Sequence, residues 1–480
     1  MSEPEPRNGK IIEWVDRRTG LNTIMKVALK EPIPGGARWA YIFGSGLIFT
    51  FMLQAITGIF LTLYYSPSAD HAYTTVSYIT KEVTSGSLIR SIHAYGSSAM
   101  VIILILHLTQ TFLFGSYKGR RELLWLSGTV LFSLILGMAF TGYLLPWDQN
   151  AYFATTVGTN VAGEVPIVGD WIKRLMRGGN DMGTLTISRF FSLHVLFIPA
   201  MIAIFVSLHV YLFRKAGAAG PYAADPVEPN LPEESFYPRQ LLMDVAFAAV
   251  LIAVLAGLAR FSPADLGPRA NPADTQYLGR PEWYYRSVFQ WLKYWNPPYT
   301  IIGVLVIPAV VGALFVGLPF YDRRKERRPW KRPVAVFVFL FILGGLIYIG
   351  RASYVEDQNN PGVRDQILQQ EKETERLMSQ PFEPELAGVA KAAPVAISPA
   401  AERGKAIFER MACGACHGEG GTGGLALKLA GIGARFPNEK LTELLRKPTP
   451  KMLEGGMSPS PLKDPELKDL AEYLTSLKPF

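Results

Sequence analysis

The sequence predicts an all-α membrane protein with seven transmembrane helices, followed by a small helical domain outside the membrane. Two observations lead to this prediction. Hydrophobic residues make up 49% of the 480 residues, which is high for a soluble protein of this size. Uncharged runs also recur that are long enough to cross a hydrocarbon layer of about 30 Å. We place these spans at residues 40–64, 93–115, 123–145, 187–212, 240–260, 299–320 and 333–350.

Residues 1–39 are charged and are predicted to form an amphipathic arm on the cytoplasmic surface. The net charge of +8 comes mainly from this arm and from the loops after spans two, four and six, and residues 321–332 alone hold seven basic residues. All of these segments lie on one side if the N-terminus is cytoplasmic, as the positive-inside rule requires. The charge therefore indicates topology and not nucleic-acid binding. Seven spans then place the C-terminus on the outer side.

Four of the six histidines lie inside spans two and four. His93 and His107 are fourteen residues apart, and His194 and His209 are fifteen apart. At about 100° per residue each pair falls on roughly one face of its helix, about 21 Å apart along the axis. Spans two and four are parallel in the predicted topology. His93 should therefore face His194 near the outer side, and His107 should face His209 near the inner side. Two facing imidazoles between helices are the usual axial ligands of a non-covalent b-type haem.

A lone histidine in a membrane helix more often forms a hydrogen bond to a neighbouring helix, but four in two matched pairs favour two haems. Spans one and three repeat the fourteen-residue interval with glycine, at Gly44 and Gly58 and at Gly128 and Gly142. A macrocycle between four helices needs neighbouring backbone without side chains, although small residues also serve ordinary helix packing in membranes. The sequence therefore predicts a four-helix haem-binding bundle.

The two cysteines of the chain, Cys413 and Cys416, stand directly before His417. This C-x-x-C-H pattern attaches a c-type haem through two thioethers, with the histidine as one axial ligand. A zinc half-site would need further Cys or His ligands in the same unit, and a redox dithiol would need a βαβ context; the sequence offers neither. The sixth ligand should be a methionine. Met457 is the first candidate, because glycine and proline surround it, and Met452 is the second.

Five regions follow from these patterns. They are the arm at 1–39, the four-span di-haem domain at 40–220, a three-span domain at 231–352, a tether at 353–400 and a small α-helical cytochrome c domain at 401–480. Covalent haem attachment takes place outside the cytoplasm, which agrees with the topology deduced from charge.

The chain resembles the cytochrome b core of the quinol–cytochrome c (bc1) and plastoquinol–plastocyanin (b6f) complexes over about residues 10–350. The stretches LIRSIHAYGSS, TGYLLPWDQ, RFFSLHVLFIP and GRPEWYY carry the resemblance. The four-span first part resembles the b6f branch, in which cytochrome b6 and the three-span subunit IV are separate chains; here residues 231–242 join them. The resemblance implies an integral protein of a bacterial inner membrane with its cytochrome c domain on the periplasmic side.

In the family, the quinol-oxidising pocket contains the motif PEWY, which is here formed by Pro281, Glu282, Trp283 and Tyr284. The resemblance implies that Glu282 accepts a proton from quinol, and a carboxylate at the membrane edge suits that task. The predicted topology places the motif outside, beside the His93–His194 pair. Tyr143, at the outer end of span three, is expected to line the same pocket. Taken alone, PEWY is equally consistent with an interfacial aromatic belt.

The resemblance also implies partners for the haem propionates. Arg90 is expected at the outer haem and Arg121 or Lys118 at the inner one, with plain anchoring at the membrane interface as the alternative. The b6f branch attaches an extra inner haem to a cysteine early in span one. The matching residue here is Ile42, which excludes a thioether-linked extra haem but not a non-covalent one. Both cysteines belong to the C-x-x-C-H pattern, so a Rieske iron–sulfur protein must be a separate chain.

These features imply the catalytic subunit of a quinol–cytochrome c oxidoreductase with a proton-translocating Q-cycle. Quinol would be oxidised near Glu282; one electron would pass to the Rieske protein and on to the fused c haem, and the other through two b haems to quinone on the inner side. Expected partners are the Rieske protein, the quinone pool, a downstream soluble or membrane cytochrome or oxidase, and a second copy in a homodimer. The alternative is a quinone-linked membrane electron conduit to outer acceptors, without a Rieske partner or Q-cycle, which would tolerate Glu282→Gln.

Overall fold

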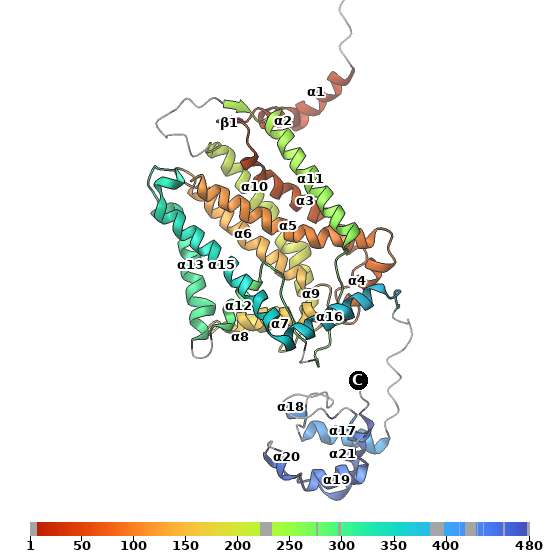
Figure 1. Cartoon of the computed structure of the whole chain (residues 1–480). Helices are drawn as coiled ribbons and strands as arrows, with labels where there is room; N and C mark the ends of the chain where they lie inside the picture. Colours follow the sequence, from red (N-terminus) through yellow and green to blue (C-terminus); the bar gives the residue numbers. More distant parts are fainter. Residues whose placement is uncertain are drawn as a thin grey trace, which may run out of the picture. The chain divides into compact units, whose positions relative to one another are not determined.

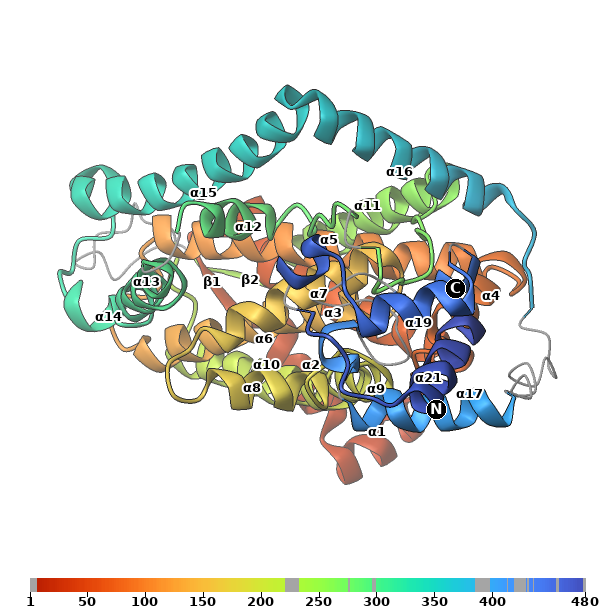
Figure 2. The same ribbon diagram turned by 90° about the horizontal axis from the view of Figure 1, so that it is seen from below.

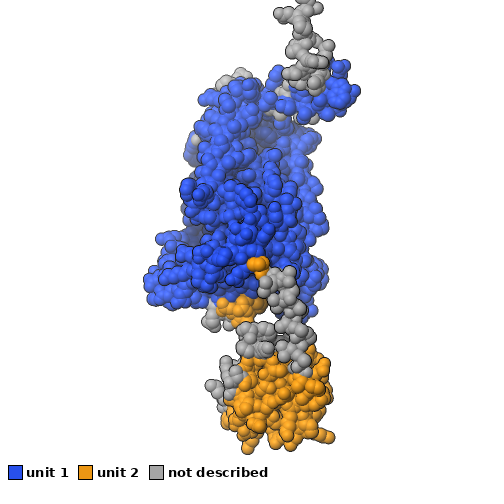
Figure 3. Space-filling model, turned by 90° about the vertical axis from the view of Figure 1, so that its right-hand side faces the viewer, with its two compact units in different colours: residues 1–270, 276–383 blue, residues 271–275, 384–480 orange. Residues whose placement is uncertain are grey.

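The computed structural model describes residues 7–220, 233–274, 277–295, 299–384, 398–411, 413–417, 429, 431–434, 436–454 and 457–477. The chain divides into two compact units (Figure 3). Unit 1 comprises residues 1–270 and 276–383, and unit 2 comprises residues 271–275 and 384–480.

Unit 1 is helical, and its described part has one short pair of strands (Figure 1). Its α-helices are α1 (Arg7–Thr19), α2 (Leu21–Leu29), α3 (Ile42–Thr62), α4 (Ala72–Lys81), α5 (Gly86–Leu113), α6 (Glu122–Tyr143), α7 (Gln149–Gly163), α8 (Gly169–Arg177), α9 (Thr184–Ser192), α10 (Ile198–Ala216), α11 (Arg239–Phe261), α12 (Arg286–Lys293), α13 (Ile307–Val316), α14 (Leu318–Tyr321), α15 (Pro333–Asn359) and α16 (Pro361–Ser379). Two segments of the described part are π-helical, η2 (Leu193–Phe197) and η3 (Ile302–Val306). The strands β1 (Pro32–Pro34) and β2 (Glu233–Ser235) pair antiparallel, with Pro32 opposite Ser235.

The long helices of unit 1 lie side by side (Figures 1 and 2). Helix α3 packs on α5, α6 packs on the helix formed by η2 and α10, and α11 contacts both α3 and α5. These helices are apolar all round, as expected for segments that face either one another or lipid. Hydroxyl side chains within them donate to carbonyls one turn earlier, for example Thr50 to Gly46 and Ser207 to Ala203. The polar groups are thereby satisfied inside an apolar layer.

Six described helices are long and apolar enough to cross a membrane: Trp39–Thr62, Gly86–Leu113, Glu122–Tyr143, Thr184–Ala216, Arg239–Phe261 and Pro333–Asn359. The expected count of seven is therefore wrong by one. The span predicted at 299–320 is divided into η3, α13 and α14, with a turn at Gly317. Segment η3 has 5 residues and α13 has 10, so together they reach about 22 Å, less than the hydrocarbon thickness.

Helices α15 and α16 follow each other almost directly, so residues 353–379 are helical except for Asn360 and belong to unit 1. The tether expected at 353–400 therefore begins too early. The Asn360 side chain caps α16 by accepting from the Val363 N–H, and Pro361 occupies the first turn, where no N–H is needed. The polar residues that suggested a tether form the exposed face of α16. The part of the expected tether at 385–397 lies outside the described residues.

Unit 2 is a small helical domain with its own core. Its α-helices are α17 (Pro399–Arg410), α18 (Gly414–His417), α19 (Asn438–Arg446), α20 (Pro450–Glu454) and α21 (Asp464–Ser476). Helices α17 and α21 pack closely at Gly404, where a Cβ atom would collide with the Asp469 carbonyl oxygen. Phe408, Leu470 and Leu474 are buried in the core beneath this contact. An independent core is the mark of a separate folding unit.

Candidate functional site

The four membrane histidines lie in two pairs between the helices, as the sequence predicts. The ring centroids of His93, on α5, and His194, in η2, are 6.2 Å apart, and the ring planes are inclined at 78°. His107 and His209 form the other pair and lie within electrostatic range of each other. Two imidazoles that bind one metal from opposite sides, through bonds of about 2 Å, have ring centroids roughly 6 Å apart. The spacing of the first pair therefore fits a shared metal ion.

The π-helical turn η2 explains why the second histidine interval is fifteen and not fourteen. This turn contains His194 and directly precedes α10, whose first turn includes Pro199. Proline has no N–H and its ring displaces the carbonyl four residues earlier, so the helix widens there by one residue. Fifteen steps that include one π-helical turn give about the same rotation as fourteen α-helical steps. His194 and His209 therefore share the phase of His93 and His107.

Three of the four imidazoles meet a hydroxyl group of a neighbouring helix at Nδ1. The hydroxyl to Nδ1 contacts are Thr57 to His93 at 3.0 Å, Ser127 to His209 at 2.8 Å and Thr141 to His194 at 3.3 Å. Each hydroxyl donates its own proton to a carbonyl of its helix, so toward the imidazole it acts as an acceptor. Nδ1 then carries the proton, and Nε2 is left free to bind a metal. His107 differs, because its buried Nδ1 has no hydrogen-bond partner among the residues that the structure describes.

Each histidine ring also packs against one of the four predicted glycines. A Cβ atom would lie near the ring Cε1 atom in every case: 3.5 Å for Gly44 and His107, 3.1 Å for Gly58 and His93, 3.2 Å for Gly128 and His209, and in direct overlap for Gly142 and His194. The glycines of α3 thus serve the histidines of α5, and those of α6 serve the histidines of η2 and α10. The room that they provide is used by the imidazoles themselves. A side chain is tolerated least at Gly142.

The PEWY loop lies at the end of the bundle that holds the His93–His194 pair. Trp283 Nε1 donates to Ser98 Oγ on α5 at 3.2 Å. The Tyr285 hydroxyl donates to the Leu136 carbonyl on α6 at 2.6 Å. Pro281 and Tyr284 are half-buried in the same segment, whereas Trp283 is 47% exposed. The loop is therefore held against both α5 and α6 close to one histidine pair.

Glu282 is the half-buried acid of this loop. Burial raises the pKa of Glu282 above its ordinary value, the backbone N–H of Trp283 lowers this pKa, and the negative charge of Asp148 raises it further. A carboxyl group whose pKa is raised is a better proton acceptor near neutral pH. Tyr143 lies within electrostatic range of Glu282, and its hydroxyl donates to the Arg280 carbonyl at 3.3 Å. The structure thus brings the two predicted catalytic side chains into one region.

The arginines predicted at the haem propionates are bonded to backbone carbonyls. Arg90 donates to Ala264 at 2.7 Å and to Asp265. Arg121 donates to Lys118 and to the two carbonyls of residues 216–217 at the end of α10. Arg90 thus joins α5 to the segment after α11, and Arg121 joins the start of α6 to the end of α10. A role toward a propionate stays a prediction for each.

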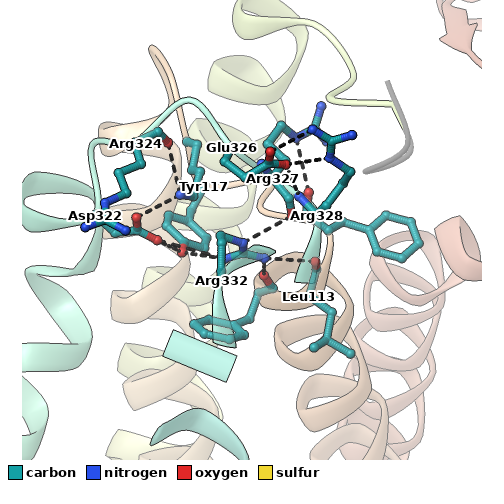
Figure 4. A network of polar contacts seen from close by, with 11 residues as sticks. Leu113, Tyr117, Asp322, Arg324, Glu326, Arg327, Arg328 and Arg332 are labelled. Atoms are coloured by element: carbon teal, nitrogen blue, oxygen red, sulfur yellow. Dashed lines mark hydrogen bonds and ion pairs between the residues drawn. The ribbon is translucent and has the colours of Figure 1, made fainter. Parts of the chain in front are cut away.

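Lys118, the other candidate for the inner haem, belongs to a buried polar network. Figure 4 shows three other members of this network, Tyr117, Asp322 and Arg332. The Lys118 Nζ atom lies 2.8 Å from Asp322 Oδ1. Asp322 also accepts from the Tyr117 hydroxyl, which in turn accepts from Arg332 Nη1 at 3.0 Å. Arg332 extends to the carbonyls of Phe112 and Leu113, each at 3.0 Å. This network joins the end of α5 to the segment between α14 and α15. The Lys118 ammonium group is already bound to Asp322 and to the Arg324 carbonyl.

In unit 2, α18 begins directly after Cys413 and contains the other two residues of the C-x-x-C-H motif, Cys416 and His417. The His417 N–H donates to the Cys413 carbonyl at 3.0 Å, and Cys413 packs against the domain core. The side chain of Cys416 lies outside the described part of the chain. The Met457 N–H donates to the Met452 carbonyl at 2.9 Å, so the backbones of the two candidate sixth ligands are in contact. The assignment of Met457 stays a prediction.

The sequence matches three known families. Residues 29–217 match the family described as cytochrome b/b6/petB, residues 269–362 match cytochrome b(C-terminal)/b6/petD, and residues 401–478 match cytochrome c. A cytochrome bc complex cytochrome b subunit from Chlorobaculum thiosulfatiphilum is 34% identical over 339 residues, which cover 70% of this chain and 78% of that protein. The chain belongs to the cytochrome b family.

Other relatives agree with this membership. A cytochrome b from Rhodospirillum rubrum is 33% identical over 73% of this chain and 87% of its own length. A cytochrome b/c1 from Bradyrhizobium diazoefficiens is 32% identical over 73% of this chain and 51% of its own length. The solved structure of a hyperthermophilic respiratory complex III superimposes with a TM-score of 0.65 at 26% identity, covering 76% of this chain and 96% of that one.

Family membership makes this cytochrome b an integral membrane protein that binds b-type haem, transfers electrons and belongs to a multi-subunit bc-type complex. Its C-terminal cytochrome c domain implies a c-type haem in the same chain. The side chains fit this chemistry as well, because the hydroxyl contacts of three imidazoles leave Nε2 available for a metal, and the glycines make room for all four rings. Sequence reasoning missed the hydroxyl partners Thr57, Ser127 and Thr141. A signal was present, since each directly precedes one of the predicted glycines.

Proposed function

We propose that the chain is the quinol-oxidising subunit of a quinol–cytochrome c oxidoreductase that operates a proton-translocating Q-cycle. One observation carries this proposal: the Glu282 loop is bonded to α5 and α6 at the end that holds His93 and His194. A proton acceptor and an electron-accepting site are thus close enough to serve one quinol molecule. This is the juxtaposition that coupled removal of a proton and an electron requires.

Glu282 receives the proton from the quinol hydroxyl in this proposal. Its raised pKa lets the carboxylate take a proton from a weak acid and still release it to the outer water. The Tyr143 hydroxyl lies beside it and is held by Asn150, which donates to it. Both side chains lie at the membrane edge, where the released proton has a short path to solvent.

The residues proposed to hold two b haems are His93 with His194 and His107 with His209. When bound, the haems supply one-electron transfer between the two faces of the membrane and out to the c domain. Thr57, Ser127 and Thr141 fix the tautomer and orientation of three of the imidazoles. In unit 2 the proposed c-haem residues are Cys413, Cys416 and His417, with Met457 as the sixth ligand.

We place the N-terminus in the cytoplasm of a bacterial cell and the cytochrome c domain in the periplasm. The four basic segments gather at one end of unit 1, which supports this orientation through the positive-inside rule. Lys118 pairs with Asp322, Arg327 donates to the carbonyls of residues 219–220, and β1 pairs with β2. The segment of η3 and α13 is shorter than the hydrocarbon layer, but in this proposal it still connects the two ends of unit 1. Near its beginning the Gly303 carbonyl accepts from Trp291 on α12, and near its end the Phe315 carbonyl accepts from Trp125 at the start of α6.

The proposal requires a separate Rieske iron–sulfur protein, which takes one electron of each quinol and passes it to the c haem of unit 2. The remaining partners are the membrane quinone pool, a downstream cytochrome or oxidase, and a second copy of the chain. Membership of a family of multi-subunit complexes supports this set.

The proposal is tested by Glu282→Gln in the purified complex, with Glu164→Gln as the control. Glu164 is an exposed carboxylate at the end of α7. Loss of a general base slows the reaction by about 100-fold or more, so Glu282→Gln should slow quinol-driven haem reduction by that factor and Glu164→Gln should not. The complex should also contain a Rieske protein. A Glu282→Gln variant with wild-type rates and no Rieske protein would favour the electron conduit without a Q-cycle.

A further inference from the structure

A buried charge cluster lies next to the PEWY loop. Asp357, near the outer end of α15, has a side chain that is only 3% exposed. Arg280 binds both of its oxygens, with Nη2 at 2.7 Å from Oδ1 and Nε at 3.0 Å from Oδ2. Arg286, on α12, reaches Oδ2 of the same carboxylate at 3.3 Å. A forked arginine–carboxylate contact of this kind fixes both distance and orientation.

The backbone of Arg280 is held as well as its side chain. Its N–H donates to Asn150 Oδ1 at 2.8 Å, and its carbonyl accepts from the Tyr143 hydroxyl at 3.3 Å. The guanidinium group also lies 5.4 Å from the centre of the Phe289 ring. Arg280 is thus fixed from two sides, by α6 and α7 through its backbone and by α15 through Asp357.

Only Pro281 separates this fixed residue from Glu282. The proline ring restricts its own φ angle to about −65°, and the residue before a proline is confined to extended conformations. The chain between Arg280 and Glu282 therefore has few soft torsions. The position of Arg280 therefore restricts the carboxylate of Glu282 to a small volume.

We propose that the Arg280–Asp357 pair is a clamp that positions Glu282 for proton transfer, so that Arg280 and Asp357 are positioning residues of the quinol site. This inference rests on the proposed function for the role of Glu282. It also ties the last membrane helix to the quinol-oxidising loop. Arg286 also binds the Asp357 carboxylate. Three residues other than proline separate it from Glu282, so its position restricts the position of Glu282 much less.

The shared carboxylate makes the clamp testable without unfolding the protein. Removal of Asp357 would leave two half-buried guanidinium groups without their shared counter-charge, which is destabilising. Removal of Arg280 leaves Asp357 still paired with Arg286. Arg280→Gln is therefore the variant of choice, and Arg286→Gln is its matched control, because each removes one guanidinium group from the same carboxylate.

The experiment compares Arg280→Gln, Arg286→Gln, Glu282→Gln and the double variant Arg280→Gln/Glu282→Gln in the whole complex. We expect Arg280→Gln to slow quinol-driven haem reduction by about 10- to 100-fold, as for a displaced catalytic group, with unchanged b-haem content. Arg286→Gln should stay within about threefold of the wild type. The double variant should be no slower than Glu282→Gln alone, because the clamp acts only through that acid.

A cryo-EM map of each single variant separates the clamp from the proposed function. Arg280→Gln should displace residues 281–284 relative to Ser98, with the histidine pairs unmoved, and Arg286→Gln should not. An undisplaced loop in Arg280→Gln, equal effects of the two arginine variants, or rate losses that multiply in the double variant would overturn the clamp. A wild-type rate in Glu282→Gln would overturn the proposed role of the acid, and the loop position in Arg280→Gln would still decide the clamp.

Discussion

Gly142 and Gly137 lie on the same helix and offer a matched pair at the scale of single residues. A Cβ atom at Gly142 would collide with the His194 ring, whereas at Gly137 the nearest atom is Ile198 Cδ1 at 4.0 Å. We predict that Gly142→Ala displaces the imidazole and removes the outer b haem, so that the b:c ratio falls from near 2:1 toward 1:1. Gly137→Ala should keep the wild-type ratio. A pyridine haemochrome spectrum measures it, and an unchanged ratio in Gly142→Ala would contradict the site.

Burial is the main cause of the raised pKa of Glu282 in the PEWY loop, and Asp148 adds to it. Its negative charge opposes ionisation of Glu282 and so raises the pKa of that group. Asp148→Asn removes the charge but keeps the helix cap to Ala151, because asparagine caps as well as aspartate. The pKa of Glu282 should then fall, and the acid limb of the rate against pH should move to lower pH. The control is Asp170→Asn, a change at an exposed residue, which should leave the pH dependence of the rate unchanged. If the acid limb does not move in Asp148→Asn, the charge of Asp148 does not influence the pKa of Glu282.

At this scale the sequence predicted the chemistry well and the supporting contacts poorly. The paired histidines and glycines could be predicted because helical spacing translates directly into faces. The hydroxyl partners were missed although each stands directly before a predicted glycine, since a Thr or Ser in a membrane helix usually bonds only to its own backbone. Asp357 was also beyond prediction. It lies more than seventy residues from Arg280 in sequence, and only the packing of α15 beside α12 brings them together.

At the scale of elements, the network around Asp322 holds α5 to the segment between α14 and α15. Lys118 and Arg332 are 7% and 6% exposed, so Asp322→Asn would leave two buried cations without their carboxylate. We expect a loss of about 3–5 kcal/mol in stability, seen as a lower temperature of thermal unfolding. The control is Asp365→Asn, whose ion pair with Arg364 is exposed and should contribute at most about 1 kcal/mol. Equal melting temperatures for the two variants would rule out a structural role for the network.

Elements were predictable where hydrophobicity alone decides them. Five of the six long spans follow uninterrupted apolar runs, and the sixth, Thr184–Ala216, contains the π-helical turn before Pro199. The predicted span at 299–320 has the same apolar composition but is divided by η3 and by the turn at Gly317. Composition does not reveal such interruptions, whereas Pro199 and Pro308 could have indicated both π-helical segments. Helix α16 lies within the predicted tether because its many charges are compatible with a polar linker as well as with an exposed helix.

For the molecule as a whole, two separate cores predict two separable haem functions. Gly404→Ala would push α17 away from α21 and loosen unit 2 alone. We expect the c-haem content to fall while the b-haem spectrum stays as in the wild type. Lys405→Ala, an exposed change on the same helix, should leave both haems in place. Loss of b haem together with c haem in Gly404→Ala would show that the two units do not fold independently.

The spacing of the histidines along their helices also has an electrical consequence for the proposed function. Fourteen helical residues separate the two pairs by about 21 Å, roughly two thirds of a hydrocarbon layer of about 30 Å. An electron that passes from the outer to the inner pair therefore crosses about two thirds of the membrane voltage. At 100 mV, negative inside, that passage costs about 1.5 kcal/mol. The histidine interval thus sets how strongly the enzyme charges the membrane, and how strongly a charged membrane slows the enzyme.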